Sequence, residues 1–157
     1  MQQLIRKWLA KMMRLFIRYQ QNRKLAFHVA LFWTILIVAA CLIPGNEVPN
    51  VHIPFADKWV HFLIFAGFAF LWLCTVTRPG FRAGIIVFLS AVVLGIAVEL
   101  LQGSGITYGR SCEFMDAVAD TVGGFLGVIL YFLLNKITPA NPNGSKDILK
   151  DKSTFQQ

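Results

Sequence analysis

Four long apolar stretches dominate this chain of 157 residues, at positions 25–43, 59–77, 84–101 and 116–134. A helix crosses a bilayer with roughly 17–25 mainly apolar residues, and each stretch is long enough. The composition agrees, because 56% of the residues are hydrophobic and the mean hydropathy is +0.59. That is too apolar for an ordinary soluble domain of this size. The predicted fold is therefore an all-α membrane protein with four transmembrane helices.

The positions of Lys and Arg predict how these helices are oriented. Thirteen of the fifteen flank one side, in the N-terminal segment, the loop between the second and third stretches, and the C-terminal flank. Lys58 and Arg110 are the two on the other side. Cytoplasmic flanks of membrane helices are enriched in Lys and Arg, so we expect both termini in the cytoplasm. The basic pI of 9.7 is then an orientation signal, and nucleic-acid binding is not expected.

The segments outside the four stretches have a different character. In residues 1–24, apolar and basic side chains recur at helical spacing, which predicts an amphipathic helix on the inner membrane surface, attracted to anionic lipid. Residues 25–135 would form the transmembrane domain, and the Pro-, Asn- and Lys-rich residues 136–157 a disordered basic tail. Residues 38–41 fit a lipoprotein cleavage box, but the basic segment before them is long for a signal peptide. We therefore keep the first stretch as a span.

Polar residues gather at three span ends that must share one membrane face, since consecutive helices run in opposite directions. They are Asp57, Lys58 and His61 at the start of the second stretch, Glu99 and Gln102 at the end of the third, and Arg110, Glu113, Asp116 and Asp120 leading into the fourth. Ionisable groups are costly in and near hydrocarbon, so this outer cluster is predicted to be a functional site. All of its members except Glu113 are predicted to bind a ligand.

Spacing predicts specific contacts within the outer cluster. His61 follows Asp57 by one helical turn, so Asp57 would hold one imidazole nitrogen. Arg110 is the expected counter-charge of the acids. Structural roles are the alternatives: Asp57 as a helix N-cap, Asp116 as an acid that complements a helix dipole, and Gln102 as an interfacial polar residue.

Small residues on the faces that carry the acids predict close helix packing. Gly95 precedes Glu99 by one turn, and the fourth stretch continues the face of its acids with Gly123, Gly124 and Gly127. Small residues let membrane helices approach closely. We therefore expect the third and fourth spans to pack through the faces that carry their acids.

Together these residues resemble the VanZ-like family of small bacterial membrane proteins. The matching elements are Asp57-Lys58 with His61, Glu99 with Gln102, Arg110 with Asp116, and Gly123 with Gly127. The family usually has Asn where this chain has Asp120, and Asp where it has Glu113. The resemblance implies a multi-pass protein of the bacterial inner membrane. It also implies a link to low-level resistance to lipoglycopeptide antibiotics such as teicoplanin.

Three classes of function fit the outer cluster, and we favour the first. A binding protein would hold an envelope ligand (a lipid headgroup, a cell-wall precursor or a lipoglycopeptide), with Lys58, His61 and Arg110 on its anionic groups. An enzyme would use His61 as a base and Glu99 or Asp120 as an acid or metal ligand, with a nucleophile sought at positions 111 and 112. A structural or assembly subunit would need no ligand.

No cofactor is expected for a binding protein. The CxxC and HExxH motifs of common zinc sites are absent from the sequence. If an ion takes part, carboxylates with one histidine suit a hard divalent ion such as Mg²⁺, Ca²⁺ or Mn²⁺. Membrane lipids are the expected partners, and the sequence carries no signal for an oligomeric state.

Overall fold

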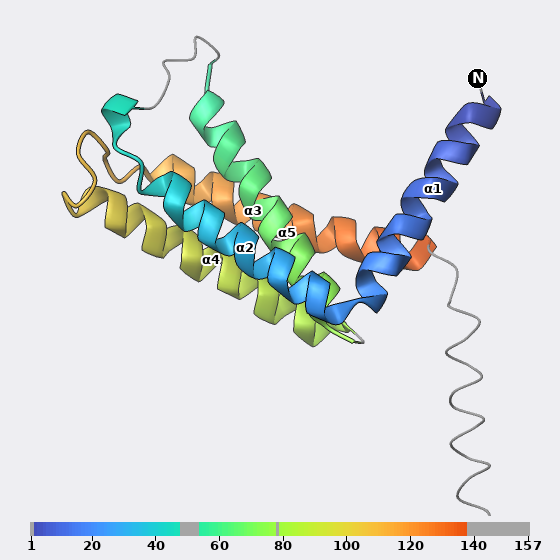
Figure 1. The fold of residues 1–157 in the computed structure, drawn as a ribbon. Helices are drawn as coiled ribbons and strands as arrows, with labels where there is room; N and C mark the ends of the chain where they lie inside the picture. Colours follow the sequence, from blue (N-terminus) through green and yellow to red (C-terminus); the bar gives the residue numbers. More distant parts are fainter. Residues whose placement is uncertain (1, 48–53, 78, 138–157) are drawn as a thin grey trace, which may run out of the picture.

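The computed structural model describes residues 2–47, 54–77 and 79–137, and every regular element within them is helical (Figure 1). The elements are α1 (Gln2–Gln21), α2 (Arg23–Cys41), the short 3-10 helix η1 (Gly45–Glu47), α3 (Ala56–Thr75), α4 (Phe81–Gly103) and α5 (Phe114–Ile137). The helices α2 to α5 are each long and apolar enough to span a bilayer. The prediction of an all-α fold with four membrane spans is confirmed, and its span limits fall within three residues of the observed ones. The predicted disordered tail falls almost entirely outside the described residues.

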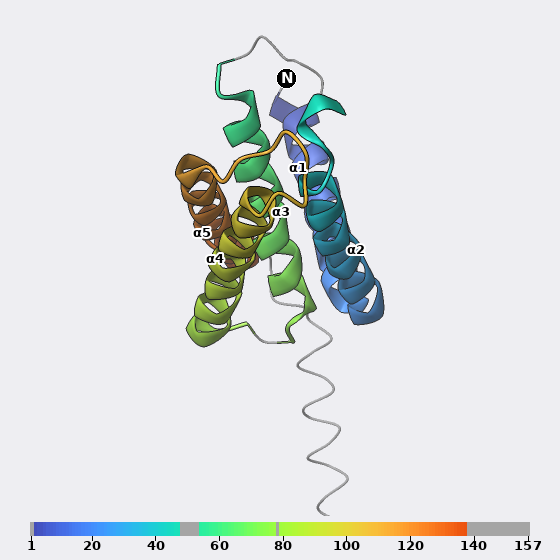
Figure 2. The ribbon, with the colours of Figure 1, turned by 90° about the vertical axis from the view of Figure 1, so that its left-hand side faces the viewer.

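Helix α3 is at the centre of the bundle. It contacts α2, α4 and α5, and its contact with α5 is the most extensive in the molecule. Figure 2 shows α3 between α2 on one side and the α4–α5 pair on the other. The spans alternate in direction, so the C-terminal ends of α2 and α4 meet the N-terminal ends of α3 and α5 (Figure 1). We call this the outer end of the bundle, and the opposite end the inner end.

Glycines set the distance between α5 and its neighbours. A Cβ atom on Gly123 or Gly127 would collide with the backbone carbonyl oxygen of Phe62 or Ala66 in α3, respectively. Gly124 faces α4 instead. The expected contact between α4 and α5 is present, but Gly123 and Gly127 of α5 pack against α3. Spacing along α5 could not reveal this, because it does not show which helix lies opposite.

Helix α1 leaves the bundle at its inner end (Figure 1). Asn22 separates it from α2, and its side chain caps α2 by accepting a hydrogen bond from the backbone of Leu25 at 3.2 Å. Phe16 packs against Phe70 and Tyr131, with ring centroids 5.8 and 6.2 Å apart. Among the described side chains of α1, four large apolar ones are more than half exposed: Leu4, Trp8, Met12 and Leu15. An exposed apolar face on a basic helix is typical of helices that lie at a membrane surface.

Candidate functional site

Lys58 is the centre of an ion-pair network at the outer end. Its Nζ atom lies 2.6 Å from Asp57 Oδ2, 2.8 Å from Glu113 Oε2 and 2.9 Å from Asp116 Oδ1. An ammonium group has three N–H donors, so these acceptors can use all of them. The network joins the first turn of α3 to the start of α5. We call these four residues the Lys58 network.

Deeper in the bundle, His61, Glu99 and Asp120 form a second group, which we call the buried trio. Nδ1 of His61 lies 3.0 Å from Oδ1 of Asp120, and Oε2 of Glu99 accepts a hydrogen bond from the backbone N–H of Glu113 at 2.8 Å. The three residues are 5%, 2% and 0% exposed. Oε1 of Glu99 and Oδ2 of Asp120 are buried with no hydrogen-bond partner within the described residues. Such unpaired oxygens are costly, so they call for a ligand, a proton or an ion.

The carboxylate of Asp120 fits inside the bundle because α4 has a glycine opposite it. A Cβ atom on Gly95 would lie 2.9 Å from both Cβ and Oδ2 of Asp120. Any larger residue at this position would press on the unpaired oxygen. Gly95 therefore makes the space that the Asp120 carboxylate occupies.

The structure pairs His61 with Asp120 and not with Asp57, which corrects the predicted pairing. Lys58 binds the Asp57 carboxylate. Asp57 is not the N-cap of α3 either, because Phe55 takes that position with a left-handed backbone (φ 59°, ψ 27°) and no side-chain capping bond. The prediction failed because it considered one helix alone, whereas α5 brings Asp120 across to α3.

Gln102 and Arg110 donate to backbone carbonyls at the C-terminal end of α2 and just beyond it. Nε2 of Gln102 donates to the oxygen of Cys41 at 2.9 Å, and Nε of Arg110 donates to that of Ile43 at 3.3 Å. Both contacts hold the outer end of α2 against α4 and the loop that follows it. Arg110 has no ion pair within the part of the chain that the structure describes. Lys58, and not Arg110 as predicted, is the counter-charge of the acids.

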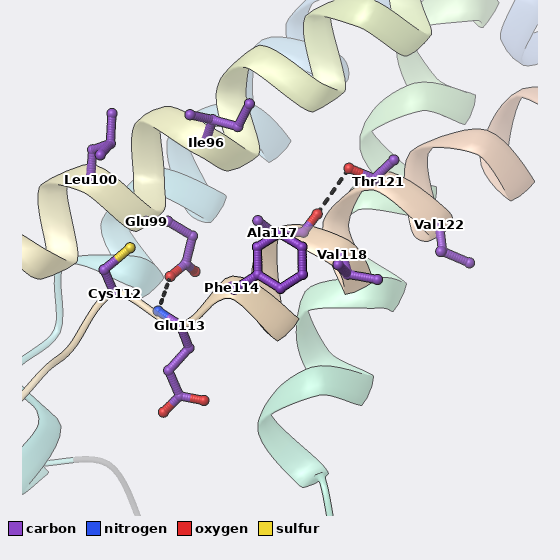
Figure 3. Close-up of a pocket in the computed structure, with 10 residues that line it drawn as sticks. All are labelled: Ile96, Glu99, Leu100, Cys112, Glu113, Phe114, Ala117, Val118, Thr121 and Val122. Carbon is purple, nitrogen blue, oxygen red and sulfur yellow. Dashed lines mark hydrogen bonds between the residues drawn. The ribbon is translucent and has the colours of Figure 1, made fainter.

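A groove of about 580 Å³ lies between the outer ends of α4 and α5 (Figure 3). Apart from Glu99, its helical lining is mainly apolar, with Ile96 and Leu100 from α4 and Val118 and Val122 from α5. These four side chains are also exposed on the outside of the bundle, where acyl chains would surround it. Glu99 is the member of the buried trio that lines the groove. The groove therefore joins a lipid-facing surface to a buried carboxylate.

Sequence reasoning missed part of this arrangement. Glu113 was left out of the ligand candidates, yet it binds Lys58 with its carboxylate and Glu99 with its backbone N–H. Glu113 lies three residues before Asp116, and this spacing was the sequence signal that could have identified it as a member of the cluster. Phe114 and other apolar residues of the groove carry no sequence signal, because they resemble the apolar residues of any membrane helix.

Negative charge exceeds positive charge at the outer end. The Lys58 network and the buried trio together hold five carboxyl groups: Asp57, Glu99, Glu113, Asp116 and Asp120. Lys58 is already bonded to three of them. The sequence predicted that Lys58 binds the phosphate or carboxylate of a ligand, and such a group would have to compete with these three acids for its N–H donors. The site is better suited to cations, amines and hydroxyl groups.

The fold and this site define a small multi-pass membrane protein with ionisable side chains buried between the outer ends of its spans. Residues 7–135 match the family model described as VanZ/LLP1, and the chain belongs to that family. The resemblance noted in the sequence is thus confirmed, over a longer part of the chain. No curated protein and no solved structure matches the chain.

Proposed function

We propose that this protein binds an amphiphilic ligand of the bacterial cell envelope, from the outer leaflet of the inner membrane. The apolar part of the ligand would lie in the groove between α4 and α5, and its polar part would reach Glu99. A membrane lipid, a lipid-linked cell-wall precursor and a lipoglycopeptide all combine an apolar chain with a polar group. We further propose that this binding underlies the link of the family to teicoplanin resistance.

The observation that carries this proposal is the unpaired oxygen of Glu99 at an apolar groove. Oε1 of Glu99 is buried without a hydrogen-bond partner in the described chain, while the residue lines the groove. Binding sites for small molecules are mostly apolar with a few placed polar groups, and volumes of about 300–1,000 Å³ are usual. A ligand amine or hydroxyl that donates to this oxygen would remove the cost of leaving it unpaired.

The charge of the site supports a donor headgroup. The one lysine of the site is bonded to Asp57, Glu113 and Asp116, so a free phosphate would meet mainly carboxylates. Amines and hydroxyls complement carboxylates instead. Among the envelope ligands considered from the sequence, those that present such groups near their acyl chain are therefore favoured.

A groove-filling substitution tests this proposal. Ala117→Trp places a large side chain in the groove. Ala97→Trp, the control, places the same side chain in an open apolar depression on α4 that no ionisable residue lines. Native mass spectrometry in mild detergent should show a bound amphiphile in wild type and Ala97→Trp but not in Ala117→Trp. Teicoplanin susceptibility of a bacterial host expressing each variant should follow the same order. Equal occupancy in all three proteins would reject the groove as the binding site.

The His61–Asp120 pair favours an enzyme as the second candidate. A buried imidazole held by a carboxylate is the arrangement of a general base, and the bond length of 3.0 Å fits it. Mass spectrometry of the bound amphiphile before and after incubation separates the two candidates. An enzyme would convert it, and His61→Gln would slow this by roughly 10²–10⁴-fold while leaving binding in place. A binding protein would leave the amphiphile unchanged.

A further inference from the structure

We propose that the buried trio is a divalent-metal site that holds Mn²⁺ or Zn²⁺. Its ligands would be one imidazole nitrogen of His61 and one carboxylate oxygen each of Glu99 and Asp120. This inference does not rest on the proposed amphiphile, because the ion would bind to side chains alone.

The spacing of the three side chains fits a single ion. One ligand atom from each of His61, Glu99 and Asp120 lies within 4.8 Å of the others. Metal–ligand distances of about 2.0–2.4 Å place the ligands of one ion at most about 4–5 Å apart. The three residues come from α3, α4 and α5, so one ion would connect three helices that contact one another.

Both unpaired buried oxygens of the described residues belong to members of this trio. Oε1 of Glu99 and Oδ2 of Asp120 are both buried without hydrogen-bond partners in the described chain. An amphiphile in the groove can reach Glu99, but Asp120 is fully buried and does not line the groove. One divalent cation bound by both carboxylates would satisfy the oxygens that it contacts and would balance two negative charges. Buried carboxylates without such compensation are rare because their desolvation is costly.

A second acidic group at the outer end serves as an internal comparison. Asp57, Glu113 and Asp116 are also close enough together for an ion. Their carboxylates already surround Lys58 Nζ, at 2.6 to 2.9 Å. A cation therefore occupies the centre of that group as part of the protein, whereas the buried trio has none. The acids of the Lys58 network should not bind a metal, and the buried trio should.

The ligand set selects the kind of ion. Of the ions considered from the sequence, Mg²⁺ and Ca²⁺ prefer oxygen ligands alone, whereas Mn²⁺ suits a site with two carboxylates. The imidazole of His61 adds Zn²⁺ as a second candidate. The absence of a thiolate among the three ligands argues against Cu⁺. Three protein ligands leave at least one coordination position for water or another oxygen, as in metal sites that are not purely structural.

Metal binding by the purified full-length protein tests this proposal directly. After treatment with EDTA, the protein in detergent is titrated with Mn²⁺ and followed by electron paramagnetic resonance, with Zn²⁺ as the competitor. We expect one saturable ion per chain. Glu99→Gln, Asp120→Asn and His61→Gln should each weaken Mn²⁺ binding about tenfold or more. Asp57→Asn, in the group that Lys58 neutralises, is the matched control and should bind as wild type does.

A spectroscopic signature keeps the test valid if these variants fail to fold. Pulsed electron paramagnetic resonance of wild-type protein with bound Mn²⁺ should show hyperfine coupling between the Mn²⁺ electrons and an imidazole nitrogen. Labelling the protein with ¹⁵N-histidine should change that coupling. If wild-type protein bound Mn²⁺ no more tightly than the Glu99→Gln/Asp120→Asn double variant does, the proposal would be overturned. Saturable binding without histidine coupling would also overturn it. Ala117→Trp should retain the ion, so failure of the groove proposal and failure of the metal proposal are distinguishable.

Discussion

The two ends of the helix bundle are both tightly packed, but they differ in whether their buried polar atoms have hydrogen-bond partners. At the inner end, Leu73, Cys74 and Tyr131 are buried, and the Tyr131 hydroxyl accepts a hydrogen bond from Gln20 at 2.9 Å. At the outer end, Glu99 and Asp120 are equally buried, but each leaves one oxygen unpaired. Within the described residues these are the two buried side-chain atoms without partners.

We interpret this difference as one between burial that serves the fold and burial that serves the proposed function. Packing and paired hydrogen bonds stabilise a membrane helix bundle, whereas unpaired carboxylate oxygens destabilise it. A chain that needed only stability would have apolar or amide side chains in place of Glu99 and Asp120. The inner end therefore serves the fold, and the outer end carries a cost that a ligand or ion would offset.

The largest expected effect concerns the side of the membrane on which the outer end lies. Tyr108 is exposed in the outer loop and Arg82 is exposed near the start of α4, at the inner end. In a background in which Cys41, Cys74 and Cys112 are replaced by Ser, we expect an impermeant maleimide to label Tyr108→Cys in intact cells. Arg82→Cys should be labelled only after the cells are permeabilised, because the basic flanks place it in the cytoplasm. The reverse pattern would place the buried trio near the cytoplasm.

The second expected effect is loss of stability at the inner end. Leu73 is fully buried, so Leu73→Ala leaves a cavity and should lower the free energy of unfolding by about 3 kcal/mol. Leu133 is 56% exposed and faces lipid, so Leu133→Ala should change it by no more than about 0.5 kcal/mol. Thermal unfolding in detergent measures both. Equal effects would show that the inner end is not a packed core.

The sequence was sufficient to predict which residues form the spans and to single out two carboxylates that the structure places inside the bundle. Span length and hydropathy are properties of one segment, so the limits of α2 to α5 were predicted within three residues. Glu99 and Asp120 stood out because carboxylates are rare inside apolar helices. The structure brings both of them together with His61, as members of one buried group.

The pairing of these residues could not be predicted in the same way. It depends on how each helix is rotated about its axis and on which helix lies opposite, and neither property is local. His61 turns toward Asp120 of α5 instead of Asp57, which is four residues away in its own helix. Lys58 was predicted to bind the anionic groups of a ligand, whereas Arg110 was expected to be the counter-charge of the acids. In the structure Lys58 pairs with three of the acids, and Arg110 donates to a backbone carbonyl.

The third prediction compares these two basic residues. Lys58→Met removes the ammonium group that bonds three carboxylates. Two of these, Glu113 and Asp116, lie just before and within the first turn of α5. The substitution should lower the free energy of unfolding by about 2 kcal/mol, since the acids are left to repel one another. Arg110→Gln removes a single 3.3 Å hydrogen bond to a backbone carbonyl and should cost about 1 kcal/mol or less. A larger loss in Arg110→Gln would restore Arg110 as the main counter-charge of the site.

The smallest effect on stability is expected where the effect on function is greatest. In metal-free protein, Glu99→Gln and Asp120→Asn should each leave the free energy of unfolding within about 1 kcal/mol of wild type, or raise it. Each change keeps an oxygen that accepts the existing hydrogen bond, from the backbone of Glu113 or from His61, and removes a buried charge. Thermal unfolding in EDTA measures stability, and teicoplanin susceptibility of the expressing host measures function. Loss of resistance with unchanged stability would support a functional outer end. A loss of more than about 2 kcal/mol would instead make both carboxylates part of the structural core, and the contrast between the two ends would disappear.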